Sequence, residues 1–222
     1  MMFRMLTYKR VKTKITARKH RLFACACSRC CWDLLTGRSR AAVEVAEKFA
    51  DGLATNTDLL KAHLAAQGEV WRTRDGVTST RQERTASMAV AHLTLLRERP
   101  YENPDALSEI TFQNGHLVAV LTKNAARKDL GWQKDWSRQV RLLRDIFGNP
   151  FRRMKLDPAW QTGTVVSLAT AIYAERAFER MAILGDALEE AGCADIDILT
   201  HCRTGGEHVF GCWLVDVLLG KE

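Results

Sequence analysis

The chain has 222 residues, of which 46% are hydrophobic and 27% are charged, with 4 prolines and 14 glycines. These proportions exclude a disordered, collagen-like or low-complexity protein and predict a globular chain with a sizeable buried core. The formal net charge is +7, but the first 40 residues carry a net +10 and the remaining 182 residues a net −3. The body of the chain therefore lacks the basic character of a nucleic-acid-binding surface.

The strongly basic stretch at the N-terminus, residues 1–16, is predicted to be an arm outside the folded body. As a nucleic-acid-binding element, the basic segment would contact phosphates through six side chains, namely Lys9, Arg10, Lys12, Lys14, Arg18 and Lys19. The alternative is a frayed terminus that binds nothing, which is common for short charged chain ends.

No segment of the sequence has the features of a signal peptide or of a membrane span. The apolar residues before Lys9 are too few for a signal peptide, and the longest apolar stretches fall far short of the ~20 residues that cross a bilayer. The number of cysteines is odd and no secretory signal is present, so we expect a cytoplasmic protein with reduced thiols and no membrane contact.

Helical periodicity begins at residue 17 and continues almost to the C-terminus. Phe23, Cys27 and Cys31 recur at intervals of four residues, which predicts a helix over residues 17–35 that ends at Gly37. Further helices are expected over residues 40–51, 57–71, 81–97, 104–127, 132–147, 164–175, 178–191, 195–203 and 212–219.

Caps and breaks support this assignment. Ser39 and Thr57 are expected to be the N-caps of the second and third helices, because their hydroxyls can accept a hydrogen bond from an N–H of the first turn. An alternating strand pattern longer than a few residues occurs only over residues 7–15. The predicted fold class is therefore all-α, an irregular multi-helix bundle of about eight or nine helices. The helices form a single domain over 17–222 or two subdomains over 17–99 and 130–222.

Four short strings carry a family resemblance. They are residues 22–27 (LFACAC), 42–52 (AVEVAEKFADG), 143–151 (LRDIFGNPF) and 208–213 (HVFGCW). On these strings the chain resembles an uncharacterised Cys-rich helical family that is abundant in planctomycete-type bacteria, over residues 18–75 and 138–222. The resemblance implies a helical fold and no known activity. The chain departs from the family pattern at Ala182, Glu207 and Phe210, where relatives tend to carry Pro, Pro and Arg.

The cysteines raise the hypothesis of a structural Zn or Fe–S site. Four of the seven lie within residues 25–31. On a helix, Cys27 shares a face with Cys30 or Cys31 and Cys25 points away, so at most two of these sulfurs can bind one ion. Further ligands would come from the C-terminal cluster of His201, Cys202, His208 and Cys212. The candidate metal ligands are therefore Cys27, Cys30, Cys31, Cys202, His208 and Cys212.

The alternative for both clusters is packing, since free cysteine is among the residues most often buried in a core. His208 and Cys212 are four residues apart, a spacing that suits two ligands on one helix. Gly205, Gly206 and Gly211 instead predict a tight turn there, which disfavours a ligand pair on a helix.

No catalytic motif stands out. The chain contains no G-x-S-x-G, H-E-x-x-H, Walker A or G-x-G-x-x-G string, so no catalytic residue is assigned. The leading hypothesis is a non-enzymatic helical interaction or accessory module that acts through an unknown protein partner and has no cofactor. The alternatives are a structural metal-binding protein with Zn or Fe–S and nucleic-acid binding through the basic arm.

Overall fold

The computed structural model describes residues 16–75, 80–94, 117–122, 132–149, 156–204 and 206–221. These residues form helices and no strand, which confirms the predicted all-α class. The chain divides into two compact units, which we call the N-terminal unit (residues 15–140) and the C-terminal unit (residues 141–222). Each unit is described by itself. The basic arm lies outside the described residues, and of the helix expected over 104–127 only residues 117–122 are described.

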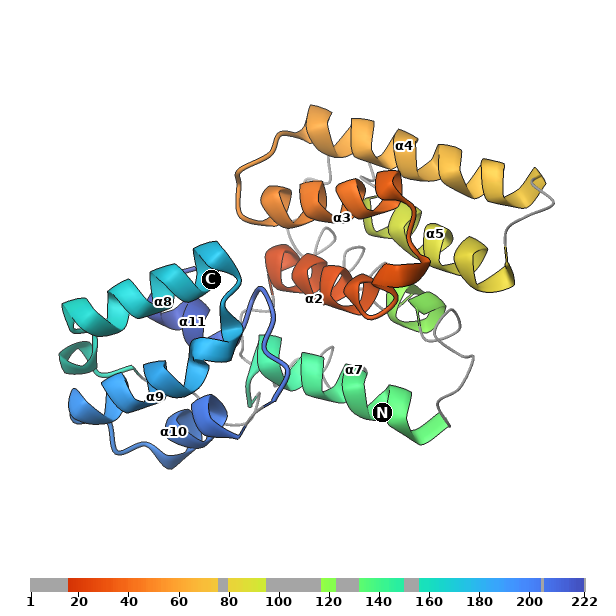
Figure 1. Cartoon of the computed structure of the whole chain (residues 1–222). Helices are drawn as coiled ribbons and strands as arrows, with labels where there is room; N and C mark the ends of the chain where they lie inside the picture. The colour runs from red at the N-terminus through yellow and green to blue at the C-terminus, as the bar shows by residue number, and fades with distance from the viewer. Residues whose placement is uncertain are drawn as a thin grey trace. The chain divides into compact units, whose positions relative to one another are not determined.

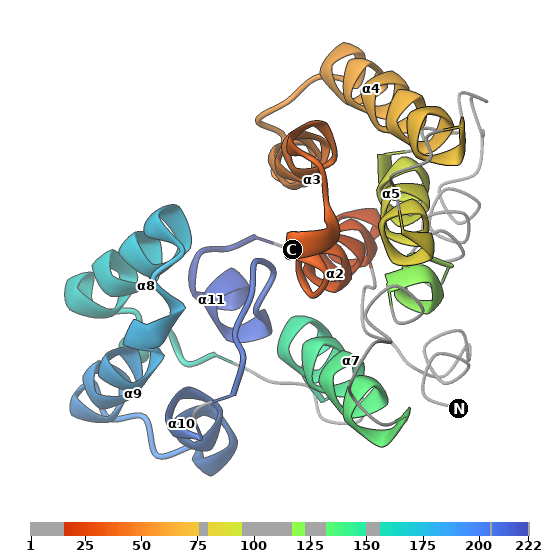
Figure 2. The same ribbon diagram turned by 45° about the vertical axis from the view of Figure 1, so that its right-hand side comes forward.

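The N-terminal unit is built on four helices: α2 (Ala17–Arg29), α3 (Gly37–Ala50), α4 (Asn56–Asp75) and α5 (Arg81–Thr94). Helix α3 lies between α2 and α4 (Figure 1), and α5 closes the group by contacting all three (Figure 2). The core between them includes Phe23, Val43 and Leu59. Helices α2, α3 and α4 therefore each contribute apolar side chains to one core.

The two predicted N-cap residues, Ser39 and Thr57, are wrong. Thr36, and not Ser39, caps α3, because the Thr36 hydroxyl accepts the Ser39 N–H at 3.2 Å and the helix begins at residue 37. Thr55, and not Thr57, caps α4, since its hydroxyl accepts the Asp58 N–H while the Asp58 carboxylate accepts the Thr55 N–H. This reciprocal pairing is a capping box, and it satisfies two otherwise free donors.

The first helix is also shorter than predicted. Helix α2 ends at Arg29, and a 3-10 turn, η1 (Trp32–Leu34), follows it. Arg29 pairs with the buried carboxylate of Glu47 at 2.6 and 2.8 Å and lies over the Trp32 ring at 4.5 Å. Arg29, the last residue of α2, therefore contacts both α3 and the 3-10 turn that follows it.

The C-terminal unit contains the end of α7 (Trp132–Phe147), then α8 (Gly163–Glu175), α9 (Met181–Glu190), α10 (Ile196–Arg203) and α11 (Trp213–Leu218). Short 3-10 turns precede α8 and α9, namely η2 (Pro158–Trp160) and η3 (Phe178–Arg180). Helix α9 packs on both α8 and α10, and α11 packs on α8 (Figure 2). Their shared core contains Ile172, Leu184 and Leu214.

Helices α9 and α10 cross at a glycine. A Cβ atom added to Gly185 would lie 2.7 Å from the Cβ of Cys202, closer than two carbons can approach without a shift. Cys202 is 2% exposed and packs in the core of the unit. The small residue on α9 therefore sets how closely α10 approaches.

Among the described residues, none of the helices combines the length and the apolar character that a bilayer crossing requires.

Replacing Gly185 with Ala tests this crossing. We expect G185A to destabilise the C-terminal unit by about 1–3 kcal/mol, because the added methyl group would overlap the Cβ of the buried Cys202 side chain. Hydrogen exchange resolved by peptide should show faster exchange in α9 and α10. Gly163→Ala, at the start of α8 with nothing within 4 Å of its added Cβ, is the matched control. Equal protection in both variants would contradict the close crossing.

Candidate metal centre

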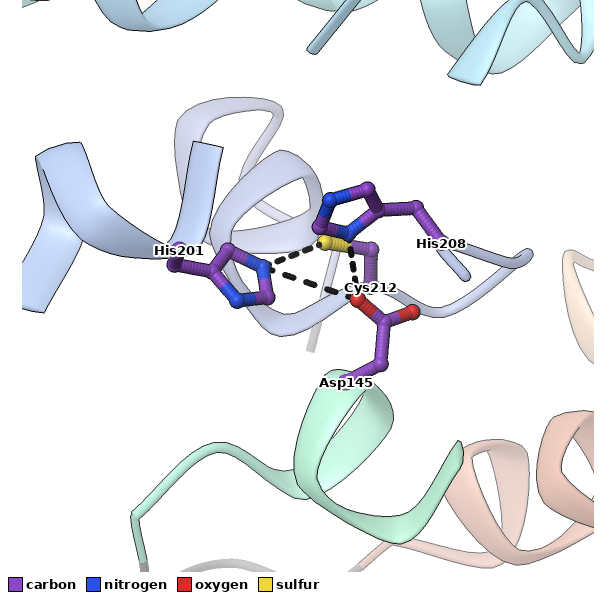
Figure 3. Close-up of side chains that lie close together, drawn as sticks. All are labelled: Asp145, His201, His208 and Cys212. Carbon is purple, nitrogen blue, oxygen red and sulfur yellow. Dashed lines mark hydrogen bonds and ion pairs between the residues drawn. The ribbon is translucent and has the colours of Figure 1, made fainter. Parts of the chain in front are cut away.

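Four side chains that can bind metals converge in the C-terminal unit: Asp145, His201, His208 and Cys212. One ligand atom from each lies within 4.8 Å of the other three. Figure 3 shows Asp145 rising from the end of α7 and His201 from α10, with the other two on the chain that leads into α11. In the described part of the chain this is the one set of three or more such residues that converges.

A tight turn brings His208 and Cys212 together. The Cys212 N–H donates to the Val209 carbonyl at 2.9 Å, and Gly211 has a φ of +87°. A type II turn requires a positive φ at its third residue, and glycine adopts it without strain. Cys212 is therefore the last residue of the turn Val209–Cys212, which immediately precedes α11, and His208 directly precedes that turn.

Phe210, at the tip of this turn, is held by an aromatic group. Its ring packs edge-on against Tyr173 at 4.7 Å and against Phe178 at 6.0 Å, and the guanidinium of Arg176 lies 4.0 Å above it. Edge-to-face and cation–π contacts of this kind add to the free energy of apolar burial. The turn between the two ligands is thus attached to α8 and η3.

Asp145 lies at the centre of the cluster. Its Oδ1 is 2.7 Å from His208 Nδ1 and 3.6 Å from His201 Nε2, and its Oδ2 accepts the Val209 N–H at 2.9 Å. Because a carboxylate can only accept, His208 Nδ1 donates to it. Oδ2 of Asp145 therefore accepts a backbone hydrogen bond, and Oδ1 lies next to the two imidazoles.

Burial disfavours the charged forms of His201 and Cys212. Desolvation lowers the pKa of His201 to about 4, an effect that the nearby Asp145 carboxylate opposes and that His208 adds to. Desolvation also raises the pKa of the Cys212 thiol well above its ordinary value, and the negative charge of Asp145 raises it further. At neutral pH, His201 is an uncharged imidazole whose Nε2, 3.2 Å from Cys212 Sγ, can accept from the thiol.

Asp145 differs from the buried carboxylates of the N-terminal unit in its partners. Glu47 pairs with Arg29, and Glu69 pairs with Arg38 and Arg72. Asp145 is about as buried as those residues, yet the side chains within 4 Å of its Oδ1 are two imidazoles and no guanidinium among the described residues. A buried carboxylate is stable when a cation or several hydrogen bonds satisfy it. Among the described residues, no arginine therefore supplies the cation that would neutralise Asp145.

The geometry fits a small divalent ion. For a tetrahedral zinc ion, two nitrogen or oxygen ligands lie about 3.3 Å apart, and a nitrogen and a sulfur ligand about 3.5 Å apart. The corresponding distances here are 3.6 Å from His201 Nε2 to Asp145 Oδ1 and 3.2 Å from His201 Nε2 to Cys212 Sγ. The 2.7 Å contact of His208 with Asp145 is a hydrogen-bond distance and would lengthen on coordination.

The sequence-based ligands fall into three groups. His208 and Cys212 lie in the cluster, together with His201, which the sequence placed in the same C-terminal group. Cys202 does not take part: neighbours on a helix point about 100° apart, and it faces Gly185 while His201 faces the cluster. Burial raises the pKa of the Cys202 thiol to about 12.

The other predicted ligands belong to the N-terminal unit. Cys25, Cys27 and Cys31 are buried and Cys30 is half-buried, and none of them belongs to a converging set of three ligands within the described residues. Burial raises the pKa of Cys31 to about 12. Their surroundings are those of small core side chains.

The predicted phosphate-binding residues are only partly described. Lys9, Arg10, Lys12 and Lys14 lie outside the described residues. Arg18 and Lys19 lie on α2, and the Arg18 guanidinium is 3.0 Å from the Asp51 carboxylate, with 12% of its side chain exposed. Arg18 is thus engaged inside the protein.

Asp145 is the ligand that sequence reasoning missed. The signal for it is weak but present: Leu142, Leu143 and Ile146 are buried apolar residues on α7, and Asp145 interrupts the same face. An acid on a buried helix face requires partners, which makes it a candidate for a site. Its partners lie more than 50 residues away in the chain and cannot be identified from local spacing.

Comparisons with family models, with curated proteins and with solved structures found no match to this chain.

Replacing Asp145 with Ala, in the presence of a chelator, tests the hydrogen bonds of the cluster. The variant leaves the Val209 N–H and both ring nitrogens of His208 without partners, because His208 Nε2 already has no hydrogen-bond partner within the described residues. Each buried unpaired group costs about 1–3 kcal/mol, so D145A should lose at least ~2 kcal/mol of stability in chemical denaturation.

The control is Asp186→Asn, an exposed acid on α9 that pairs with Arg203. An exposed ion pair contributes little to stability, so D186N should unfold like the unmodified chain. If D145A also unfolded like the unmodified chain, Asp145 would not be the centre of the cluster.

Proposed function

We propose that the protein is a helical module whose C-terminal unit is built around a structural zinc ion, bound by Asp145, His201, His208 and Cys212. One observation carries the proposal: four ligand atoms from three separate segments lie within 4.8 Å of one another around a buried carboxylate that pairs with no arginine among the described residues.

The donor set favours zinc. One sulfur, two imidazole nitrogens and one carboxylate oxygen form a mixed set that suits Zn²⁺, whereas Mg²⁺ and Ca²⁺ take oxygen ligands. A carboxylate and a thiolate together carry two negative charges, so a divalent ion leaves the buried centre neutral. A bound cation also favours the thiolate of Cys212 over the thiol, which reverses the effect of burial on that group.

The centre has the character of a structural site. Zinc in such sites has four protein ligands, whereas catalytic zinc keeps a position for water or substrate. Here four side chains supply the full tetrahedral set, and the side chains of Asp145 and His208 are 5% and 6% exposed. The ion would tie the end of α7, the last turn of α10 and the turn before α11 into one unit.

Metal binding by defined variants tests this function. The purified chain, prepared without chelator, should contain about one equivalent of zinc by elemental analysis, and Co²⁺ should give the visible bands of a tetrahedral site with a thiolate ligand. C212A should lose the thiolate-to-cobalt band. H201A should bind Co²⁺ about 10–100-fold more weakly or worse, because removing a residue that only orients a metal ligand already costs that much affinity.

Cys202→Ala is the matched control, because it removes a buried thiol next to His201 that faces away from the centre. C202A should bind the metal as the unmodified chain does. A chelator should lower the melting temperature of C202A and leave that of C212A unchanged. If the unmodified chain binds neither Zn²⁺ nor Co²⁺ after reconstitution, the metal function is wrong.

We also propose that the module acts through protein contacts, the function expected from the sequence. The supporting observation is an apolar stripe on α4, where Leu60, Leu64 and Trp71 are 37%, 58% and 54% exposed. These residues are spaced by four and seven positions and share one helix face. An exposed apolar stripe of this kind is suited to contact another protein.

A photo-crosslinking residue at position 64 tests the stripe. It should capture a partner protein that the same residue at position 48, an exposed lysine of α3, does not capture. Once that partner is purified, L64E should weaken its binding by at least ~1 kcal/mol, as expected for a central apolar contact. Equal capture at both positions, or equal binding by L64E, would rule out the stripe.

The remaining expectations are proposals without support from the described residues. They are the family resemblance with its bacterial distribution, the cytoplasmic location, and nucleic-acid binding through residues 1–16. Deleting residues 1–16 should abolish retention on a nucleic-acid column and leave zinc binding unchanged. Unchanged retention would rule out nucleic-acid binding through the arm.

A further inference from the structure

His201 is the least enclosed member of the metal centre. Its side chain is 17% exposed, against 5% for Asp145 and 6% for His208. Ligand histidines usually donate their second ring nitrogen to a carboxylate or carbonyl, which fixes the ring. Within the described residues, the contacts of His201 within hydrogen-bond or ion-pair distance all involve Nε2, and none involves Nδ1. Packing against neighbouring side chains must therefore orient the ring.

Two rings flank the His201 imidazole. His208 meets it nearly at a right angle, with centroids 4.8 Å apart, and is itself a ligand. Trp213 lies on it at 5.0 Å with a tilt of 45°. Trp213 belongs to α11 and follows Cys212 directly, so its indole position is coupled to that of the sulfur ligand.

Gly148 allows Trp213 to occupy this place. A Cβ atom at position 148 would lie 3.1, 3.4 and 3.5 Å from three atoms of the indole, so the ring rests almost on the backbone. Gly148 has a φ of +64° and its N–H donates to the Arg144 carbonyl at the end of α7. The contact between Gly148 and Trp213 therefore joins the end of α7, which carries Asp145, to the start of α11, where Cys212 is the N-cap.

We propose that Trp213, seated on Gly148, is a positioning residue of the metal centre, which holds the His201 imidazole with Nε2 toward Cys212 and Asp145. This inference rests on the proposed zinc centre. Without the indole, the imidazole of an exposed ligand gains rotational freedom, and the centre loses the geometry that a bound ion requires.

The first test compares two tryptophans of the same unit. W213L should bind Co²⁺ about 10–100-fold more weakly in competition with a chelator, and the visible bands of the bound ion should change shape. W213F keeps an aromatic face and should recover most of the loss. Trp160→Leu is the control, because Trp160 packs on the same core without contacting His201.

The second test moves the indole without removing it. G148A forces a left-handed alanine and pushes on Trp213, so it should weaken Co²⁺ binding in the same direction as W213L. Gly192→Ala is the matched control, since Gly192 has a φ of +89° in the same unit and nothing within 4 Å of an added Cβ. Circular dichroism confirms that each variant is folded before titration.

The outcomes separate the two proposals. If the unmodified chain binds Co²⁺ and W213L binds it equally well, or W160L loses as much affinity as W213L, the positioning role is wrong and the metal centre stands. The same holds if G148A and G192A bind alike. If the unmodified chain binds no metal, both proposals are wrong.

Discussion

The arrangement of the C-terminal unit depends on how one buried carboxylate is satisfied. Asp145 lies on the apolar face of α7 and is 4% exposed, and a carboxylate buried to this extent requires hydrogen-bond donors. The Val209 N–H and His208 Nδ1 supply them at 2.9 and 2.7 Å. Because both donors belong to the segment before α11, satisfying this acid fixes that segment to the end of α7, and the placement of Cys212 follows.

The two units solve the same problem in different ways. Glu47 receives two hydrogen bonds from Arg29, whose guanidinium also stacks on Trp32, so a permanent cation neutralises the acid. Asp145 has imidazoles instead, and burial keeps His201 neutral by lowering its pKa to about 4. An arginine pair is complete within the protein, whereas an acid with a neutral imidazole and a thiol beside it is suited to an added cation.

Periodicity predicted the all-α fold because apolar residues buried at helical spacing are visible in the sequence, as with Phe23 and Cys27 on α2. The helix starts were less predictable: several hydroxyl residues lie near each start, and Thr36 and Thr55 were chosen over Ser39 and Thr57 by contacts within the first turn. Of the metal centre, the C-terminal histidines and Cys212 could be found from sequence. Asp145 could not, since its relation to them exists only after the chain has folded.

The glycines near the C-terminus show why local spacing was a poor guide to the site. A pair of ligands four residues apart suits a helix, and Gly211 argues against a helix between His208 and Cys212. The turn Val209–Cys212 instead folds the chain back directly after His208, and its third residue, Gly211, has a φ of +87°, which glycine adopts without strain. The residue that disfavours a helical ligand pair is therefore the one that makes a turn-based pair possible. Phe210 then attaches that turn to Tyr173, so the two ligands are held by packing as well as by backbone geometry.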